Sequence, residues 1–177
     1  MQKIIVFDLE TQKLSDEVGG WGNIKDMLLA VGVTQDINTR EFSVYYEKDA
    51  KSLIQELYDA DLVIGFNQIR FDYTVLKHYG LRSPAKIKSL DMLAEIEKAL
   101  GHRLSLDAVC SVTLKTGKTA DGIDAVRWFK QGKFDQVTEY CKKDVEITRD
   151  LYLFGKENGY LKYKKRNGKI TRIPVDW

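Results

Sequence analysis

The sequence has few of the residues that build disulfide frameworks and zinc sites. It contains only two cysteines, Cys110 and Cys141, and two histidines, His78 and His102. The cysteines lie far apart among apolar neighbours, and none of the four residues has the spacing of a metal-ligand motif. We therefore expect small buried thiols in a reducing compartment and histidines at the surface.

Long apolar runs are also missing. No stretch approaches the roughly 20 apolar residues that a membrane span requires, and an acid at position 8 interrupts what would be the core of a secretory signal. Charged residues make up 31 % and hydrophobic residues 44 % of the chain, a balance that disfavours disorder. We expect a cytoplasmic protein without a membrane partner. Residues 1–177 contain no repeat or linker and are expected to form a single domain.

An excess of charge of one sign is absent as well. The formal net charge is +2, so composition alone indicates nucleic acid only weakly. The last part of the chain is locally basic, through Lys162, Lys164, Lys165, Arg166, Lys169 and Arg172. This cluster gives a first hint of a nucleic-acid partner.

Hydrophobic periodicity indicates an α/β protein. Strands are expected at 3–11, 27–36, 40–47, 61–67 and 86–90, and helices at 49–60, 69–80 and 91–101, from Ser105, from Asp121, and at 135–157. Asn167-Gly168 then lies between two strand-like runs, which predicts a basic C-terminal hairpin at 160–175. A three-strand antiparallel meander followed by alternating helices and strands predicts a mixed five-stranded sheet flanked by helices.

The first predicted strand ends in two acids. Because successive side chains alternate across a strand, Asp8 and Glu10 share a face with the apolar Ile4 and Val6. Taken alone, a solvated strand end explains this pattern equally well.

Two predicted helices also carry acids at inward positions. Asp144 interrupts the mostly apolar seam of the long helix, and Asp72 lies one turn from Val75 and Leu76. Burial of an ionised carboxylate without a partner costs several kcal/mol, and no arginine lies in these stripes. We therefore predict a divalent cation site. Oxygen ligands favour Mg²⁺ or Mn²⁺, and four carboxylates could hold two ions in an arrangement suited to phosphodiester hydrolysis.

Three motifs occur in order along the chain. They are Asp8-Leu9-Glu10, Asn67-Gln68-Ile69-Arg70-Phe71-Asp72 and Tyr140-Cys141-Lys142-Lys143-Asp144. Together they resemble the motifs of the DEDD exonucleases of the ribonuclease H-like superfamily, over residues 1 to about 155. Glu139 stands where one branch of that family has histidine, and Tyr140 matches the other, tyrosine-containing (DEDDy) branch. The sequence is similar to the proofreading domains of family B DNA polymerases and to helicase-associated exonuclease domains.

The resemblance implies a ribonuclease H-like fold and a 3′–5′ exonuclease acting on single-stranded nucleic acid, DNA rather than RNA, with a role in DNA repair. Asp8 would bridge two Mg²⁺ or Mn²⁺ ions whose remaining ligands are Glu10, Asp72 and Asp144, and Tyr140 would orient the attacking water. The substrate contacts that it implies are Thr11, Trp21, Asn67 and Phe71. A helicase or polymerase partner is expected.

Other functions fit parts of the same pattern. A non-catalytic module could use the groove and the basic hairpin to hold DNA, although here no acidic ligand is missing. An endonuclease on a related fold could also use clustered acids, but Tyr140 and the Asn67-to-Asp72 spacing disfavour it. Asn67 and Phe71 have an equally good structural explanation, as strand-end hydrogen bonding and core packing.

Overall fold

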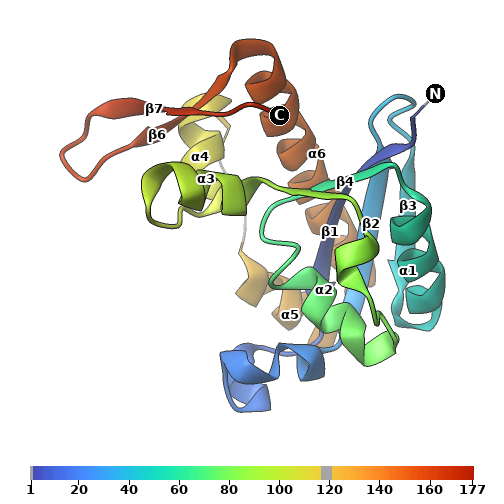
Figure 1. Cartoon of the computed structure of the whole chain (residues 1–177). Coiled ribbons are helices and arrows are strands. Elements are labelled where there is room, and N and C mark those ends of the chain that lie inside the picture. Colours follow the sequence, from blue (N-terminus) through green and yellow to red (C-terminus); the bar gives the residue numbers. More distant parts are fainter. Residues whose placement is uncertain (1, 117–120) are drawn as a thin grey trace.

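Five strands form one mixed sheet in the computed structural model, which describes residues 2–116 and 121–177 (Figure 1). Its strand order is β3-β2-β1-β4-β5. The strands are β1 (Ile4–Thr11), β2 (Leu29–Asp36), β3 (Phe42–Tyr46), β4 (Leu62–Gly65) and β5 (Ser89–Asp91). The first three pair antiparallel, whereas β4 and β5 run parallel to β1. The predicted meander and mixed sheet are confirmed.

Six α-helices connect or cover the strands in the described part of the chain. They are α1 (Ala50–Asp59), α2 (Asp72–Leu76), α3 (Met92–Leu100), α4 (Leu106–Thr113), α5 (Gly122–Lys130) and α6 (Phe134–Asn158). Short 3₁₀ helices are η1 (Ser15–Val18), η2 (Trp21–Met27), η3 (Glu47–Asp49), η4 (Lys77–Tyr79) and η5 (Pro84–Lys86). The sequence pattern did not indicate η1 and η2, which occupy the segment after β1.

One predicted helix is much shorter than expected. The 69–80 region forms an α-helix only from Asp72 to Leu76 and continues as the 3₁₀ helix η4. Asn67 has a positive φ of 75°, so the chain before α2 is a turn instead of a helix. The helical segment ends at its predicted limit, where Gly80 follows η4 with a φ of 102°.

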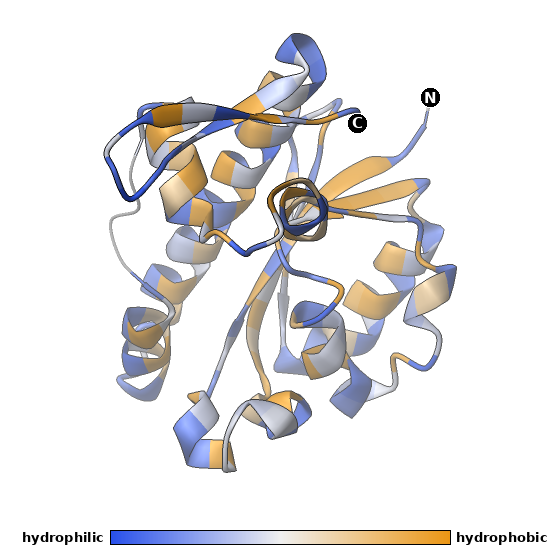
Figure 2. Ribbon diagram, turned by 60° about the vertical axis from the view of Figure 1, so that its left-hand side comes forward, coloured by the Kyte–Doolittle hydropathy of each residue, from blue (hydrophilic) through white to orange (hydrophobic). Residues whose placement is uncertain are grey.

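The two faces of the sheet pack against different helices. Val6 and Val33 belong to a core that includes residues of α3 to α6, whereas Phe7 and Leu9 belong to a core with residues of α1 and α2. The alternation along β1 produces this division. Asp8 has the same strand parity as Val6, so it faces the side that α6 covers. Figure 2 shows the apolar strands in orange between the flanking helices.

The chain ends in a two-stranded antiparallel hairpin, as predicted. Its strands are β6 (Tyr160–Lys164) and β7 (Ile170–Pro174), and Gly168 adopts a φ of 84° in the turn between them. The hairpin lies beside α3 and α4, away from the main sheet (Figure 1).

The burial of the cysteines and histidines agrees with the expectation from the sequence. Cys110 and Cys141 are buried thiols, and His78 and His102 are exposed. In the described residues, no helix is both long and apolar enough to span a lipid bilayer.

Candidate active site

The carboxyl ends of β1, β4 and β5 lie at one edge of the sheet, because these three strands are parallel. Strand β4 ends at Gly65, which lies beside Phe7 of β1. Strand β1 continues beyond this point. The backbone N–H of Leu9 therefore has no β4 carbonyl opposite it and donates instead to Oδ1 of Asp72, at 3.1 Å. This bond fixes the start of α2 beside the acidic end of β1.

Helix α6 brings a thiol against the same strand. Sγ of Cys141 lies 3.5 Å from the carbonyl oxygen of Asp8 and 3.7 Å from its Oδ2. One ligand atom each from Asp8, Glu10 and Cys141 lie within 4.8 Å of one another. Glu10 is buried, and the Asp8 carboxylate is partly exposed.

The charges of all four predicted acids act on the thiol of Cys141. Burial raises the pKa of the Cys141 thiol well above its ordinary value, and the charges of nearby carboxylates raise it further. In order of their effect, these are Asp8, Glu10, Asp144 and Asp72. Asp144 is only 4 % exposed, at the inward position that the α6 seam predicted.

The carboxylate of Asp72 is itself unfavourable in its charged form. It is 3 % exposed, and burial raises its pKa well above the ordinary range; the charges of Asp8 and then Asp91 add to this effect. Acids that repel one another at close range are stabilised by a hard divalent cation, and the oxygen donors here suit Mg²⁺ or Mn²⁺. The donor set therefore fits an oxygen-coordinated ion.

Tyr140 lies one turn before Asp144 on α6 and is 8 % exposed. The ring of Trp128, from α5, packs edge-on against it with the ring centroids 6.0 Å apart. Trp128 is partly buried against the core. Tyr140 is therefore held on the side of α6 that also carries Asp144.

Trp21 and Phe71 come together although fifty positions separate them. Their ring centroids are 6.3 Å apart, and Trp21 is 65 % exposed. They line a pocket of about 410 Å³, which we call the apolar pocket. Its other lining residues include Glu10, Thr11, Ile123 and Val126. One of the clustered acids, Glu10, therefore lines the same pocket as the aromatic and aliphatic side chains.

A second cavity, of about 320 Å³, is also lined by these two rings. We call it the arginine pocket; it is lined by Trp21, Ile24, Asn67, Arg70, Phe71 and Arg103. Arg103 donates to Oδ1 of Asn67 at 2.5 Å and to Glu97 at 2.9 Å. Two of the four predicted substrate contacts, Trp21 and Phe71, line both pockets. Thr11 lines the apolar pocket, and Asn67 lines the arginine pocket.

Sequence reasoning missed Asp91 as a residue of this region. Its Oδ1 accepts the N–H groups of Asn67, Leu93 and Ala94, and its Oδ2 accepts that of Ile69. One buried carboxylate therefore holds both the loop before Asp72 and the first turn of α3. Its place directly after the predicted strand at 86–90 was the available signal.

Sequence reasoning also missed Arg103 and the position of Cys141 inside the acidic cluster. Arg103 belongs to no motif, and its contact with Asn67 spans 36 positions.

The two lysines of the third motif form ion pairs with other residues of α6. Lys142 pairs with Glu139, and Lys143 pairs with Glu146.

Comparisons with known proteins agree with this architecture. A sequence model of the RNase H superfamily, RNase_H_2, matches residues 5–154. No curated protein matches the chain significantly. Among solved structures, the family B DNA polymerase from the hyperthermophilic archaeon Pyrobaculum calidifontis superposes with a TM-score of 0.62 at 15 % identity, over 89 % of this chain and 24 % of the polymerase.

Weaker structural matches are two complexes of E. coli exonuclease I. The zinc-bound complex with single-stranded DNA gives a TM-score of 0.49 at 13 % identity, and the complex with a dA16 oligonucleotide gives 0.45 at 13 %. Each match covers 89 % of this chain and 41 % of the exonuclease. The chain thus spans well under half the length of the solved proteins that it resembles.

Proposed function

The chain belongs to the RNase H superfamily, and from this premise we propose that it is a metal-dependent 3′–5′ exonuclease of the tyrosine-containing DEDD branch. Its substrate is single-stranded DNA, and its products are nucleoside 5′-monophosphates. The observation that carries the proposal is the acidic end of β1, where ligand atoms of Asp8 and Glu10 lie within 4.8 Å of each other and the N–H of Leu9, between them, donates to Asp72.

Asp8, Glu10, Asp72 and Asp144 would hold two Mg²⁺ or Mn²⁺ ions. Such ions, when bound, lower the pKa of a water molecule and neutralise charge on the phosphodiester. The protein's own contribution is to keep the carboxylates in place. The backbone bond from Leu9 to Asp72 and the contact of Cys141 with Asp8 both serve this purpose.

Tyr140 positions the attacking water in this proposal. A free tyrosine has a pKa of about 10, so its hydroxyl is a poor base at neutral pH. It can orient a water molecule by hydrogen bonding, and its packing against Trp128 fixes the ring from which the hydroxyl extends. We therefore assign Tyr140 a positioning role and no role as proton acceptor.

The terminal nucleotide of the strand would enter the apolar pocket. Its volume of about 410 Å³ is in the range of small-ligand pockets. Trp21 and Phe71 offer aromatic faces for a base, and Ile123 and Val126 supply an apolar wall. Glu10 lines the same pocket, so the sugar-phosphate end of that nucleotide would lie at the acidic cluster.

The remaining expectations are part of the same proposal. We propose that residues 1–177 form one domain, with the motif-bearing core at 1–155, and that it acts in the cytoplasm with a polymerase or helicase partner in DNA repair.

A 5′-labelled single-stranded oligonucleotide, incubated with Mg²⁺ or Mn²⁺, tests the activity. We expect a ladder of products that shortens from the 3′ end and disappears with EDTA or with Asp144→Asn. Internal cuts would show an endonuclease. An intact strand that still shifts on a native gel would show a binding module and would overturn the exonuclease proposal.

A further inference from the structure

The C-terminal hairpin is held rigidly against α4. The Thr113 hydroxyl donates to the carbonyl oxygen of Lys162 at 3.0 Å and accepts the N–H of the same residue at 2.9 Å. Leu161 and Ile173, on the packed face, are fully buried. The tip of the hairpin therefore has a fixed position relative to the elements beneath it.

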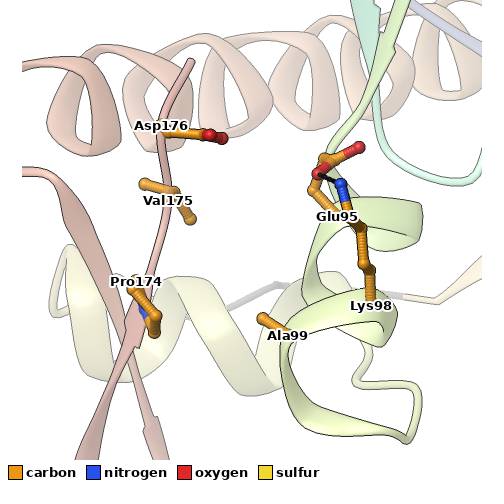
Figure 3. Close-up of a pocket in the computed structure, with 6 residues that line it drawn as sticks. All are labelled: Glu95, Lys98, Ala99, Pro174, Val175 and Asp176. Atoms are coloured by element: carbon orange, nitrogen blue, oxygen red, sulfur yellow. Dashed lines mark ion pairs between the residues drawn. The ribbon is translucent and has the colours of Figure 1, made fainter.

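The base of the hairpin has mixed charge. Figure 3 shows Val175 and Asp176 on the segment after β7, opposite Glu95 and Lys98 of α3, across a small cavity. Glu95 and Lys98 form an ion pair at 3.6 Å. Nothing at this end favours a polyanion.

The tip is different, because its charged side chains are all cationic. Lys164, Lys165, Arg166 and Lys169 are exposed there, and Figure 2 shows the tip as hydrophilic. Under the tip lies a cavity of about 770 Å³, which we call the hairpin cavity. Its lining residues are Leu100, His102, Leu104, Tyr163, Lys164, Lys165, Arg166 and Asn167, none of them acidic.

One loop connects this cavity to the candidate active site. The loop at 101–105 joins α3 to α4; its His102 and Leu104 line the hairpin cavity, and Arg103 lines the arginine pocket. Trp21 and Phe71 then line both the arginine pocket and the apolar pocket. The three cavities therefore follow one another from Glu10 to the hairpin tip.

We infer that these cavities form a track for the single strand whose 3′ end lies at the acidic cluster, and that the hairpin tip grips the strand several nucleotides upstream. The polarity of this track depends on the proposed function; the existence of a single-strand site along it does not.

The chemistry of the track matches a single strand better than a duplex. Arg103 uses two of its five N–H donors on Asn67 and Glu97 among the described residues, which leaves donors for a phosphate. The exposed ring of His102 lies beside the cations and packs edge to face against the buried ring of Tyr163, with the ring centroids 6.2 Å apart. Aromatic rings next to positive charge are the usual surface for unpaired bases.

The hairpin tip can be tested by binding, without reference to cleavage. Fluorescence anisotropy measures the affinity of the full chain for labelled oligothymidylates of about 2 to about 15 nucleotides, with EDTA present so that the probes stay intact. The variant combines Lys164→Ala, Lys165→Ala and Arg166→Ala. We expect its Kd to rise about tenfold for the longest probe and to match that of the native chain for the shortest. The slope of the logarithm of its binding constant against the logarithm of the salt concentration should become shallower by about 2. Each lost phosphate contact lowers the steepness of this slope by about 0.7 for a single strand.

A matched control removes the same three charges elsewhere. Arg82, Lys86 and Lys88 are exposed, and they precede β5, at the edge of the sheet opposite the acidic cluster. The triple alanine variant at these positions should bind every probe like the native chain. The inference is overturned if both triple variants lose affinity equally, if neither does, or if the native chain shows no gain of affinity with length.

The binding experiment and the cleavage experiment test the two proposals independently. If no strand is cleaved while binding depends on the hairpin, the track stands and the proposed activity fails. If a labelled strand is shortened from its 3′ end while the hairpin variant binds normally, the activity stands and the track fails.

Discussion

At the residue scale, the site consists of acids whose charges are mutually unfavourable without a cation. Asp72 is the clearest case, because burial and the charges of Asp8 and Asp91 all raise its pKa. This side chain also accepts the N–H of Leu9. A substitution that keeps the acceptor and removes the charge therefore separates its structural role from its electrostatic one.

We predict that Asp72→Asn stabilises the metal-free protein at neutral pH. A carboxyl whose pKa is raised by folding contributes most to stability below its unfolded pKa of about 3.9, and that contribution is lost as pH rises through the folded pKa. The Tm of the native chain in EDTA should therefore fall relative to that of Asp72→Asn as pH rises from about 4 to neutrality. Parallel curves of Tm against pH for the two proteins would contradict the assigned electrostatics.

The water-positioning role of Tyr140 gives a second prediction. Tyr140→Phe removes only the hydroxyl, so kcat should fall about 10- to 100-fold while the Mn²⁺ affinity stays unchanged. Tyr152→Phe, on the same helix and also buried, is the matched control and should retain native kcat. Equal rates for both variants would remove Tyr140 from the mechanism.

At the element scale, the loop before α2 is the part that local sequence describes least well. Its conformation depends on bonds from Asn67 and Ile69 to Asp91, more than twenty positions away. No local periodicity encodes such contacts, and a helix was predicted at 69–80 for this reason. Close packing also constrains the loop, since a Cβ on Gly65 would lie 2.7 Å from the Gln68 side chain.

We predict that Asp91→Ala destabilises the fold by about 2 to 4 kcal/mol, because four N–H groups, that of Leu93 buried and the others partly buried, lose a charged acceptor. Urea unfolding measures the loss. Asp91→Asn keeps the Oδ1 acceptor and should recover part of the stability. Ser105→Ala, which removes the cap of α4 alone, is the comparison and should cost about 1 kcal/mol. A loss no larger than that of Ser105→Ala would show that Asp91 is only a helix cap.

Other elements were predictable because their signal is local and repeated. The alternation of β1 placed Asp8 and Glu10 on one face, and the α6 seam placed Asp144 inward. Gly168 follows Asn167 in the hairpin turn, as the dipeptide predicted. The pairing of Trp21 with Phe71 and the bond between Arg103 and Asn67 could not be predicted, because each depends on the packed arrangement of separate elements.

At the scale of the whole molecule, the fold brings the separate parts of the site to one edge of the sheet. Parallel β1, β4 and β5 deliver Asp8, the loop before Asp72, and Asp91 to that edge, and α6 crosses it with Asp144. The 101–105 loop lines both the arginine pocket and the hairpin cavity, and so it connects the hairpin to this site. The proposed cation site and the proposed strand track therefore lie on adjoining surfaces built from distant segments.

Anomalous diffraction from a crystal soaked in Mn²⁺ tests the central claim most directly. The account predicts two peaks coordinated by carboxylate oxygens of Asp8, Glu10, Asp72 and Asp144, and their loss in Asp8→Ala crystals of the same fold. Crystals with no peak between these side chains, or with Mn²⁺ bound only elsewhere, would contradict it.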